Sequence, residues 1–134
     1  MVDGHGRAHP YRLGFASHLG VATGKPTIGV AKSRLIGDLK EVWEDTFLIH
    51  DGEIIGAAVS VRKGVKPVYV SVGHLVSLDS AIKIAKHCLR LARVPEPMRI
   101  AHNLASKERK AKIAAATETG AGVSQVKQEI ERII

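Results

Sequence analysis

The sequence has a single cysteine, few aromatic residues and no long apolar run. Cys88 has no second cysteine with which to form a disulfide within the chain, so a reducing, cytoplasmic setting is expected. Aromatic residues make up 4% of the 134 residues, which argues against the base-stacking surfaces of RNP or OB domains. No apolar run reaches membrane-spanning length, and residues 1–20 lack the apolar segment of a signal peptide. We therefore expect no disulfide scaffold and no contact with a membrane.

What the sequence does contain is enough apolar residues for one core and an excess of positive charge. Hydrophobic residues make up 45% of the chain, and no repeat or domain linker interrupts it. We expect a single domain over residues 1–134, with an extra tail helix within 120–134 that Gly120-Ala121-Gly122 separates from the preceding helix. Twenty Lys and Arg against 13 Asp and Glu give a net charge of +7. This charge favours a polyanionic partner, nucleic acid above all, and ordinary solubility charge is the alternative.

Apolar periodicity and turn residues predict alternating helices and strands. Helices are expected over residues 12–21, 80–93, 98–116 and 124–134, strands over 26–32, 46–50, 53–61 and 67–72, and a polar connection with a short helix over 33–44. The clearest signal is Asp51-Gly52, which favours a type I′ hairpin turn between two of the strands. Ser77 and Asp79 are candidate N-caps for the second helix. Strands mixed with helices indicate a layered α/β or α+β fold.

Chemically versatile side chains gather near the amino end, at residues 3–10. Asp3 can ligate a divalent cation, His9 suits phosphate or proton work, and Gly4 and Gly6 can bring backbone N–H groups against a ligand. Each feature also has an ordinary explanation. Asp before Gly is common turn chemistry, a lone His9 is as often a surface or capping residue, and Gly-x-Gly alone is not a dinucleotide fingerprint.

Polar residues also follow two of the expected strands, Lys32 after one and His74 after the other. Ligand sites of α/β sheets lie at the carboxyl ends of strands. If Val2 ends a third strand, Asp3, Lys32 and His74 are expected to converge, with Asp3 holding a metal ion and Lys32 offsetting charge on a phosphate. A solvated lysine and a loop histidine are the alternatives. Three further histidines fall in helical patterns and are assigned to structure: His18, His87 and His102.

Four segments, in order, resemble the signature stretches of the endonuclease V family. They are DGHGRAHPYRLG at 3–14 with ASHLG at 16–20 behind it, PTIGVAKSRL at 26–35, GHLVSLDSA at 73–81, and PEPMR at 95–99. The similarity runs from Asp3 to about Ala116. Four segments in one order are specific, whereas any one of them alone is weak.

The resemblance implies an RNase H-like α/β fold with a mixed sheet and flanking helices. It also implies a magnesium-dependent DNA repair endonuclease, with Mn²⁺ as an alternative ion, that recognises deoxyinosine in DNA or inosine in RNA. Such an enzyme cuts the strand one nucleotide 3′ of the lesion. By match to the family pattern, the catalytic positions are Asp3, Lys32, His74 and His9, with Asp3 as the metal ligand and His74 supporting the metal's water shell. The matching substrate-binding positions are Gly4, His5, Gly6, Ala31 and Ser33.

The family pattern also contains elements that this sequence does not show. These are a strand carrying an aspartate, a helix, a wedge motif with a tyrosine, and a glutamate that completes the metal site. We therefore expect the chain to correspond to the C-terminal two thirds of an endonuclease V, without its N-terminal strands. Weak metal binding, poor or absent cleavage, and low stability or self-association follow from this expectation. The number of copies in the functional form is left open.

Two other functions compete with this interpretation. A non-catalytic nucleic-acid-binding protein would use the basic turn of Arg62, Lys63 and Lys66 together with the basic residues of 107–112. A small-molecule α/β enzyme would carry the four segments by coincidence.

Overall fold

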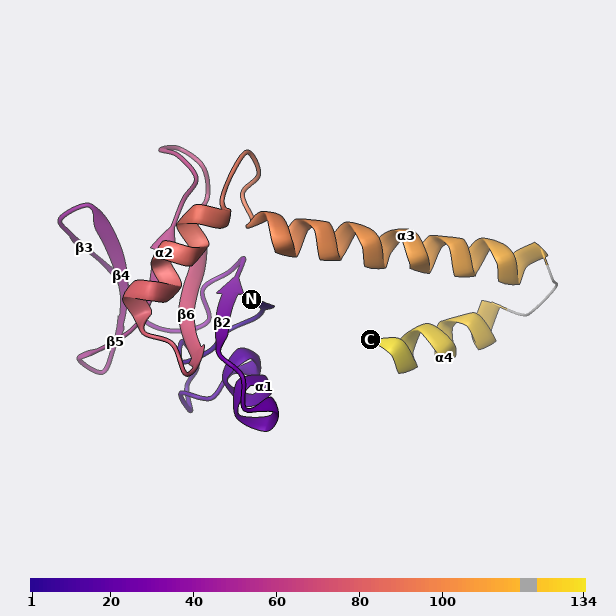
Figure 1. Ribbon diagram of the computed structural model, residues 1–134, viewed down its shortest axis with the longest axis horizontal. Helices are drawn as coiled ribbons and strands as arrows, with labels where there is room; N and C mark the ends of the chain where they lie inside the picture. Colours follow the sequence, from indigo (N-terminus) through magenta and orange to yellow (C-terminus); the bar gives the residue numbers. More distant parts are fainter. Residues whose placement is uncertain (119–122) are drawn as a thin grey trace. The chain divides into compact units, whose positions relative to one another are not determined.

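In the computed structural model, six strands form one sheet in the order β1-β2-β6-β5-β4-β3 (Figure 1). Their bounds are Val2–Asp3 (β1), Thr27–Ala31 (β2), Asp38–Val42 (β3), Asp45–His50 (β4), Glu53–Val59 (β5) and Val68–His74 (β6). β1 pairs with β2 in parallel, and each of the other neighbouring pairs is antiparallel. Helices flank this sheet, which confirms the expected mixed α/β architecture.

The structure describes residues 1–118 and 123–134, in two units, Met1–Met98 and Arg99–Ile134. The expected boundary at Gly120-Ala121-Gly122 lies outside the described residues, and the single-domain expectation stays a prediction. Among the described residues, no helix combines the length and apolarity that a membrane crossing requires.

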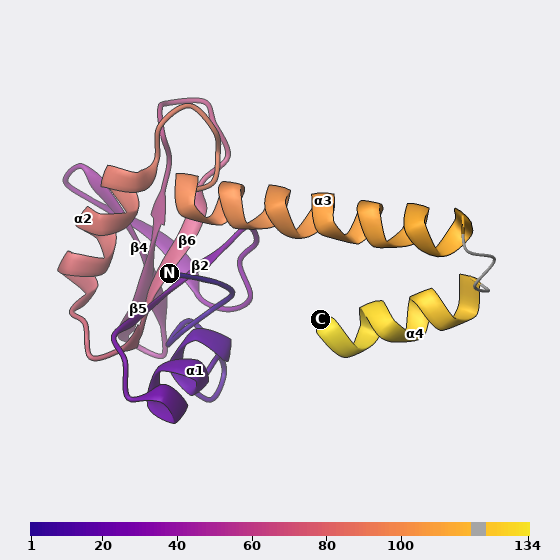
Figure 2. The same cartoon turned by 45° about the vertical axis from the view of Figure 1, so that its right-hand side comes forward.

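Two helices pack on the sheet of the first unit (Figures 1 and 2). α1 (Phe15–Thr23) lies against β2 and β6 near one end of the sheet, and α2 (Leu78–Cys88) lies across β5 and β6. α1 ends at Gly24, whose φ of 66° is the left-handed conformation that glycine adopts freely. The N-cap predicted at Ser77 is confirmed, since its side chain accepts a hydrogen bond from Ser80 N at 3.1 Å. α2 ends at Cys88, five residues before the predicted end, because Leu89 is already extended.

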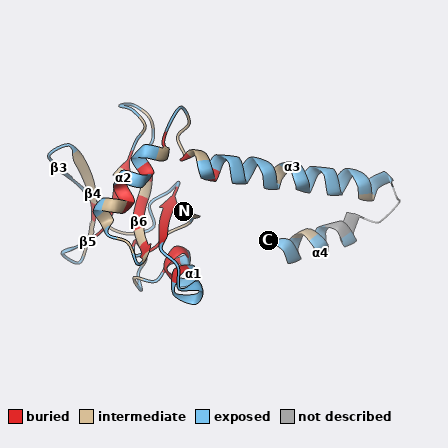
Figure 3. Ribbon diagram, viewed as in Figure 1, coloured by how far each residue is buried: buried red, intermediate tan, exposed pale blue. Residues whose placement is uncertain are grey.

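Different parts of the chain cover the two faces of the sheet, and successive side chains of β6 point to one face and then the other. Val68 and Val70 are buried in the core beneath α2, whereas Tyr69 and Ser71 point to the opposite face. The buried core under α2 is built from small and branched residues of β2, β5, β6 and α2: Ile28, Val30, Ala57, Val59, Val68, Val70, Ala81, Ile82, Ala85 and Leu89, with Met98. Figure 3 shows this buried interior in red. The segment at 4–14, called loop 4–14 below, covers the opposite face.

The structure corrects the expectation for residues 33–44. Asp38–Val42 is a strand, β3, that pairs with β4 at the edge of the sheet, where a connection with a short helix was predicted. All five of its residues are exposed. The segment therefore lacks the alternation of buried apolar and exposed polar positions by which a strand is recognised in a sequence. The adjoining hairpin prediction is confirmed, with φ of 52° at Asp51 and 74° at Gly52 in the turn between β4 and β5.

The helical stripe predicted at residues 12–21 is only partly right. α1 forms, but its buried residues are Ala16, Ser17 and Gly20, while Phe15 is 63% exposed. Small residues face the sheet because α1 approaches β2 and β6 closely. The large apolar residues therefore remain on the surface.

The predicted C-terminal helices are both present. α3 (Glu96–Glu118) begins two residues earlier than predicted, because Pro97 is tolerated in a first turn where its missing N–H has no helical partner to lose. α4 (Val123–Ile133) matches the predicted tail helix over its described part. Most described residues of the two helices are exposed (Figure 3), including the basic residues of 107–112.

Candidate active site

The ends of β1 and β2 bring a carboxylate and an ammonium group together. β1 runs parallel to β2 with Asp3 opposite Val30, so Lys32, just past β2, lies at the same edge of the sheet. Lys32 Nζ is 3.5 Å from Asp3 Oδ2, and the two side chains are 49% and 56% exposed. An ion pair this exposed contributes about 0–1 kcal/mol to folding. The pair is therefore accessible to a ligand and is a minor contributor to stability.

His74 lies at the other end of the sheet. β6 is antiparallel to β2, so its last residue, His74, pairs with Thr27, the first residue of β2. A Cβ added to Gly20 of α1 would lie 2.3 Å from His74 Cβ, which shows how tightly this end is packed. The expected convergence of His74 with Asp3 and Lys32 is therefore wrong. It assumed that β2 and β6 end at the same edge, which holds only for parallel strands.

Loop 4–14 crosses the face of β2 to reach β6. Its backbone N–H groups donate to β2 and β6: Gly4 N to Val30 O (3.1 Å), Gly6 N to Ser71 Oγ (2.9 Å) and Arg7 N to Val72 O (2.8 Å). At the crossing point, a Cβ on Gly29 would lie 2.5 Å from Gly6 N. The expectation that Gly4 and Gly6 present N–H groups to a ligand is therefore wrong. Both amides are engaged within the chain, and Gly6 also serves close backbone packing, since a Cβ there would lie 2.0 Å from Val72 O.

His5 ties this loop to the residue after Lys32. Its Nε2 lies 3.0 Å from Ser33 O, and since a carbonyl only accepts, Nε2 carries the proton. Burial lowers the pKa of His5, which favours the neutral ring. Among the described residues, Nδ1 is buried without a hydrogen-bond partner. Of the other predicted substrate-binding residues, Ala31 is 7% exposed and belongs to the core, whereas Ser33 is exposed.

His9 is half-buried and its polar contacts lie within loop 4–14. Its Nδ1 accepts a hydrogen bond from Tyr11 N at 3.2 Å, which leaves the proton on Nε2. The rings of His9 and Tyr11 are 5.9 Å apart and tilted by 41°. This geometry fixes the ring orientation of His9 through its own loop.

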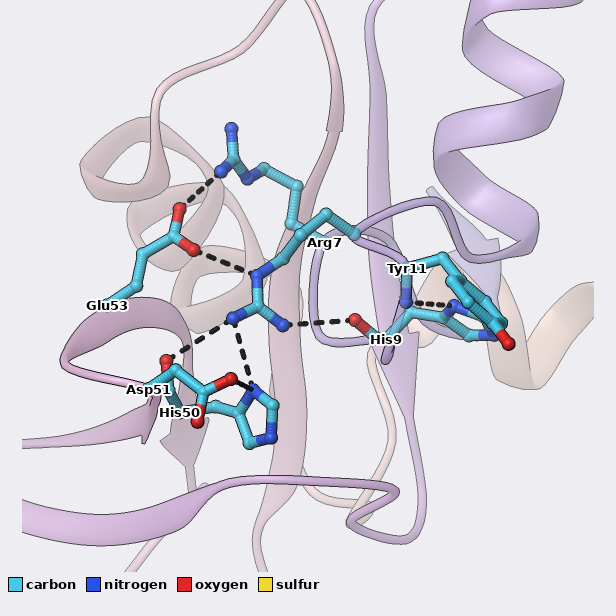
Figure 4. Close-up of polar contacts among 7 residues, drawn as sticks. Arg7, His9, Tyr11, His50, Asp51 and Glu53 are labelled. Carbon is cyan, nitrogen blue, oxygen red and sulfur yellow. Dashed lines mark hydrogen bonds and ion pairs between the residues drawn. The ribbon is translucent and has the colours of Figure 1, made fainter.

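A cluster that the sequence did not predict anchors loop 4–14 to the β4–β5 hairpin (Figure 4). It consists of Arg7, Arg12, His50 and Glu53, and is called the Glu53 cluster below. Each carboxylate oxygen of Glu53 accepts a hydrogen bond from an arginine, one from Arg7 Nη2 at 2.5 Å and the other from Arg12 Nε at 2.9 Å. The hydrogen bond from Arg12 is the main reason that the pKa of Glu53 lies below its ordinary value. The charge-assisted hydrogen bonds from two arginines to the Glu53 carboxylate thus hold loop 4–14 against the sheet.

Arg12 is the centre of this cluster. Its guanidinium also donates to His9 O (3.2 Å), His50 O (3.3 Å) and His50 Nδ1 (3.1 Å). Its φ of 56° is unusual for a residue with a side chain, and these contacts offset the strain. The sequence offered no signal for this cluster, because Arg12 and Glu53 meet only when the loop has crossed the sheet.

The sequence predicts a metal centre at Asp3, which needs further donor side chains close to that carboxylate. Asp3 is a suitable oxygen ligand, but among the described residues no three His, Cys, Asp or Glu side chains lie close enough to hold one ion. Magnesium takes near-octahedral coordination. The described donors therefore do not form a complete magnesium site, and Asp3 is a single carboxylate beside Lys32.

Comparison with known proteins places this geometry in a family. The sequence profile of endonuclease V matches residues 1–103. Endonuclease V of Roseiflexus castenholzii is 53% identical over 115 residues, covering 81% of this chain and 51% of the relative. That of Trichormus variabilis is 55% identical over 112 residues, covering 79% of this chain and 50% of the relative. The chain thus spans about half the length of the curated relatives it matches.

Solved structures agree with the sequence relatives. The endonuclease V of Streptomyces avermitilis superposes with a TM-score of 0.74 at 42% identity, covering 81% of this chain and 50% of that one. That of Ciona intestinalis, solved in complex with a 24mer DNA containing an inosine followed by a ribo-adenosine, superposes with a TM-score of 0.69 at 34% identity over 81% of this chain and 53% of that one. The RNase H-like fold expected from the sequence is therefore confirmed. With the profile match over most of its length, the chain belongs to the endonuclease V family.

Proposed function

We propose that this chain takes part in endonucleolytic cleavage of nucleic acid that contains inosine, deoxyinosine in DNA or inosine in RNA. The observation that carries the proposal is the exposed Asp3–Lys32 pair at one edge of the sheet, 3.5 Å apart, in a chain of the endonuclease V family. The Ciona relative was crystallised with inosine-containing DNA, which supports the substrate class. The same proposal includes repair of deoxyinosine lesions, a cut one nucleotide 3′ of the lesion, and a cytoplasmic location.

Lys32 is the residue of this chain best suited to the scissile phosphate. Its ammonium group is exposed, and a positive charge near a phosphoryl group offsets the negative charge that grows in the transition state. Asp3 holds Lys32 Nζ on one side, so a phosphate would approach from the exposed side of the pair. His9, with its proton on Nε2, is the candidate proton donor or phosphate contact in loop 4–14.

Magnesium dependence, with manganese as a substitute, is also part of the proposal, although the described donors do not complete a metal site. Asp3 would supply one carboxylate oxygen, and the ion would activate water and polarise the phosphate. Because one carboxylate gives weak binding, the chain alone is expected to bind magnesium weakly and to cleave slowly or not at all.

The test is a comparison of matched oligonucleotides. A labelled strand with one deoxyinosine and the same strand with deoxyadenosine at that position are titrated with the chain in the presence of Mg²⁺, and affinity is followed by fluorescence anisotropy. We expect tighter binding of the inosine strand. We also expect Lys32→Met to weaken its binding roughly tenfold, the effect of losing one charge-assisted contact. Lys25→Met, at an exposed lysine away from the pair, is the matched control.

Cleavage is read from the same samples on a sequencing gel. A weak product cut one nucleotide 3′ of inosine, lost in Asp3→Asn, would support the proposal in full. Equal affinity for the two strands, with no effect of Lys32→Met, would overturn it. Robust magnesium-dependent cleavage by the chain alone would instead refute the expectation of an incomplete metal site.

A second candidate function rests on the exposed basic residues. Arg62, Lys63 and Lys66 are exposed in the turn between β5 and β6, and this turn could bind nucleic acid without cleaving it. A salt titration separates the two functions. Both lose affinity as salt rises, but only the endonuclease prefers inosine and requires magnesium.

A further inference from the structure

Arg93 is a half-buried residue between α2 and α3 that none of the sequence motifs singles out. Its Nη2 donates to the backbone carbonyl of Lys32 and, at 3.0 Å, to that of Pro67. Pro67 immediately precedes β6, and Lys32 immediately follows β2. One guanidinium therefore joins the backbone on the two sides of the antiparallel pair.

The position of these carbonyls explains why a side chain is needed there. The ladder between β2 and β6 ends with the pair Ala31 and Tyr69. Beyond that pair the strands no longer exchange backbone hydrogen bonds, so the two carbonyls, exposed at Lys32 and part-buried at Pro67, take their donor from outside the ladder. The charged donor of Arg93 continues the ladder by one step and fixes the backbone of Lys32.

A second side chain holds the next residue. His5 Nε2 donates to Ser33 O at 3.0 Å, so two consecutive carbonyls, those of Lys32 and Ser33, are each held from outside β2. Lys32 leaves the backbone at this fixed point, and its Nζ lies 3.5 Å from Asp3 Oδ2. A flexible lysine side chain has considerable rotamer freedom, so a fixed backbone narrows where its charge can be.

We propose that Arg93 is a positioning residue for Lys32, acting through the Lys32 carbonyl to keep the ammonium group beside Asp3. Its meaning for catalysis rests on the proposed function, but the positioning itself does not. When Arg93 is substituted, Lys32 keeps its charge, but its ammonium group is no longer held beside Asp3. The substrate contact is then weakened almost as much as if Lys32 were absent.

The first experiment needs no substrate and uses the full chain. The ¹³Cε signal of Lys32 is identified by its disappearance in Lys32→Met, and its change on Asp3→Asn is measured at one pH. We expect Asp3→Asn to shift the Lys32 signal clearly in the wild-type background and little or not at all in the Arg93→Met background. In Arg93→Met the order parameter of the Lys32 amide should also fall, from about 0.85 towards 0.6. Arg90→Met, an exposed arginine three residues earlier, should keep the wild-type response.

A merely structural role for Arg93 predicts a different result. Arg93→Met would then lower the melting temperature while the Lys32 signal still responded to Asp3→Asn, and that outcome would overturn the proposal. If Arg93→Met does not fold, Arg93→Lys, which keeps a charged donor near the two carbonyls, carries the test. It should give an intermediate response, and a full wild-type response together with an unchanged order parameter would count against positioning.

The second experiment uses the inosine strand. Arg93→Met and Lys32→Met should each weaken binding roughly tenfold, and the double variant should bind no more weakly than Lys32→Met, because the two changes remove one contact. Additive losses would contradict positioning. If the strand shows no inosine preference while the Lys32 signal behaves as expected, the proposed function fails and the positioning role of Arg93 remains.

Discussion

The two ends of β2 differ in what holds them. At the Thr27 end, backbone and small side chains are packed tightly, with Gly20 and His74 in direct contact. At the Lys32 end, packing gives way to directed polar contacts, from Arg93 and His5 to backbone carbonyls and from Lys32 to Asp3. The Thr27 end is thus held mainly by shape, with one buried hydrogen bond from Thr27 Oγ1 to Ala16 O (2.7 Å), whereas the Lys32 end is held by charge and hydrogen bonding. This difference teaches that the packed end supports the fold, while the polar end is the part open to chemistry.

The largest effect is expected from crowding the packed end. In Gly20→Ala the new Cβ would lie 2.3 Å from His74 Cβ and 2.4 Å from Thr27 Oγ1, so α1 has to move. We expect a loss of about 2–3 kcal/mol in the free energy of unfolding, measured by urea denaturation. The matched control is Gly24→Ala, where nothing lies within 4 Å and only the φ of 66° opposes a side chain, at a cost of about 1 kcal/mol. Equal losses in the two variants would show that this end is not tightly packed.

The next effect is expected at His74 itself. His74→Ala removes a half-buried ring from the contact with α1, and we expect the free energy of unfolding to fall by about 1–2 kcal/mol. Affinity for the inosine strand should stay at the wild-type value, because His74 is at the opposite end of the sheet from Lys32. A loss of affinity without a loss of stability would mean that His74 belongs to the candidate site, and it would contradict the contrast between the two ends of β2.

A smaller effect, visible through pH, is expected in the loop that links the two ends. The pKa of Glu53 is lowered in the folded protein, so its contribution to stability is present above the ordinary value of 4.5 and is lost as pH falls through the lowered pKa. The melting temperature of Glu53→Gln should therefore lie below that of the wild type at pH 7, and the gap should close on acidification from pH 5 towards 3. Glu41→Gln, at an exposed residue of β3, is the matched control for the loss of one surface carboxylate. A gap that widens with acid would mean that the Glu53 cluster does not stabilise the loop.

The smallest change in stability is expected at the polar end. Lys32→Met removes an ion pair between two half-exposed side chains, so the free energy of unfolding should change by about 0.5 kcal/mol or less in urea denaturation. The comparison is sharpest when this variant and Gly20→Ala are measured together. A loss above about 2 kcal/mol in Lys32→Met would mean that the pair is part of the framework after all.

Much of the fold follows from local sequence signals. The buried strand Thr27–Ala31, the hairpin around Asp51-Gly52 and the Ser77 cap each depend on neighbours in the chain, and all three are confirmed. β3 was missed because an edge strand exposed along its whole length shows no periodicity. α2 was predicted too long, since apolar residues continue past Cys88 in a segment that no longer has helical backbone.

The candidate site depends more on tertiary structure and was predicted less well. Asp3 and Lys32 come together as expected because Asp3 ends β1, Lys32 follows β2, and the two strands are parallel neighbours. His74 does not join them, because the direction of β6 cannot be read from its own residues. Arg93 and the Glu53 cluster were missed for a similar reason. Their contacts join residues tens of positions apart that carry no shared motif.

The crossing of β2 by loop 4–14 bears on the order in which the molecule assembles. The bond from Gly6 N to Ser71 Oγ joins residues 65 positions apart, so it can form only after β6 has docked beside β2. The edge that carries Asp3 and Lys32 is then completed late in folding, and the amides of Gly6 and Arg7 should exchange with solvent hydrogen only when the central strands separate. A nucleic acid held at this edge would for that reason protect the whole sheet from opening, and not the loop alone.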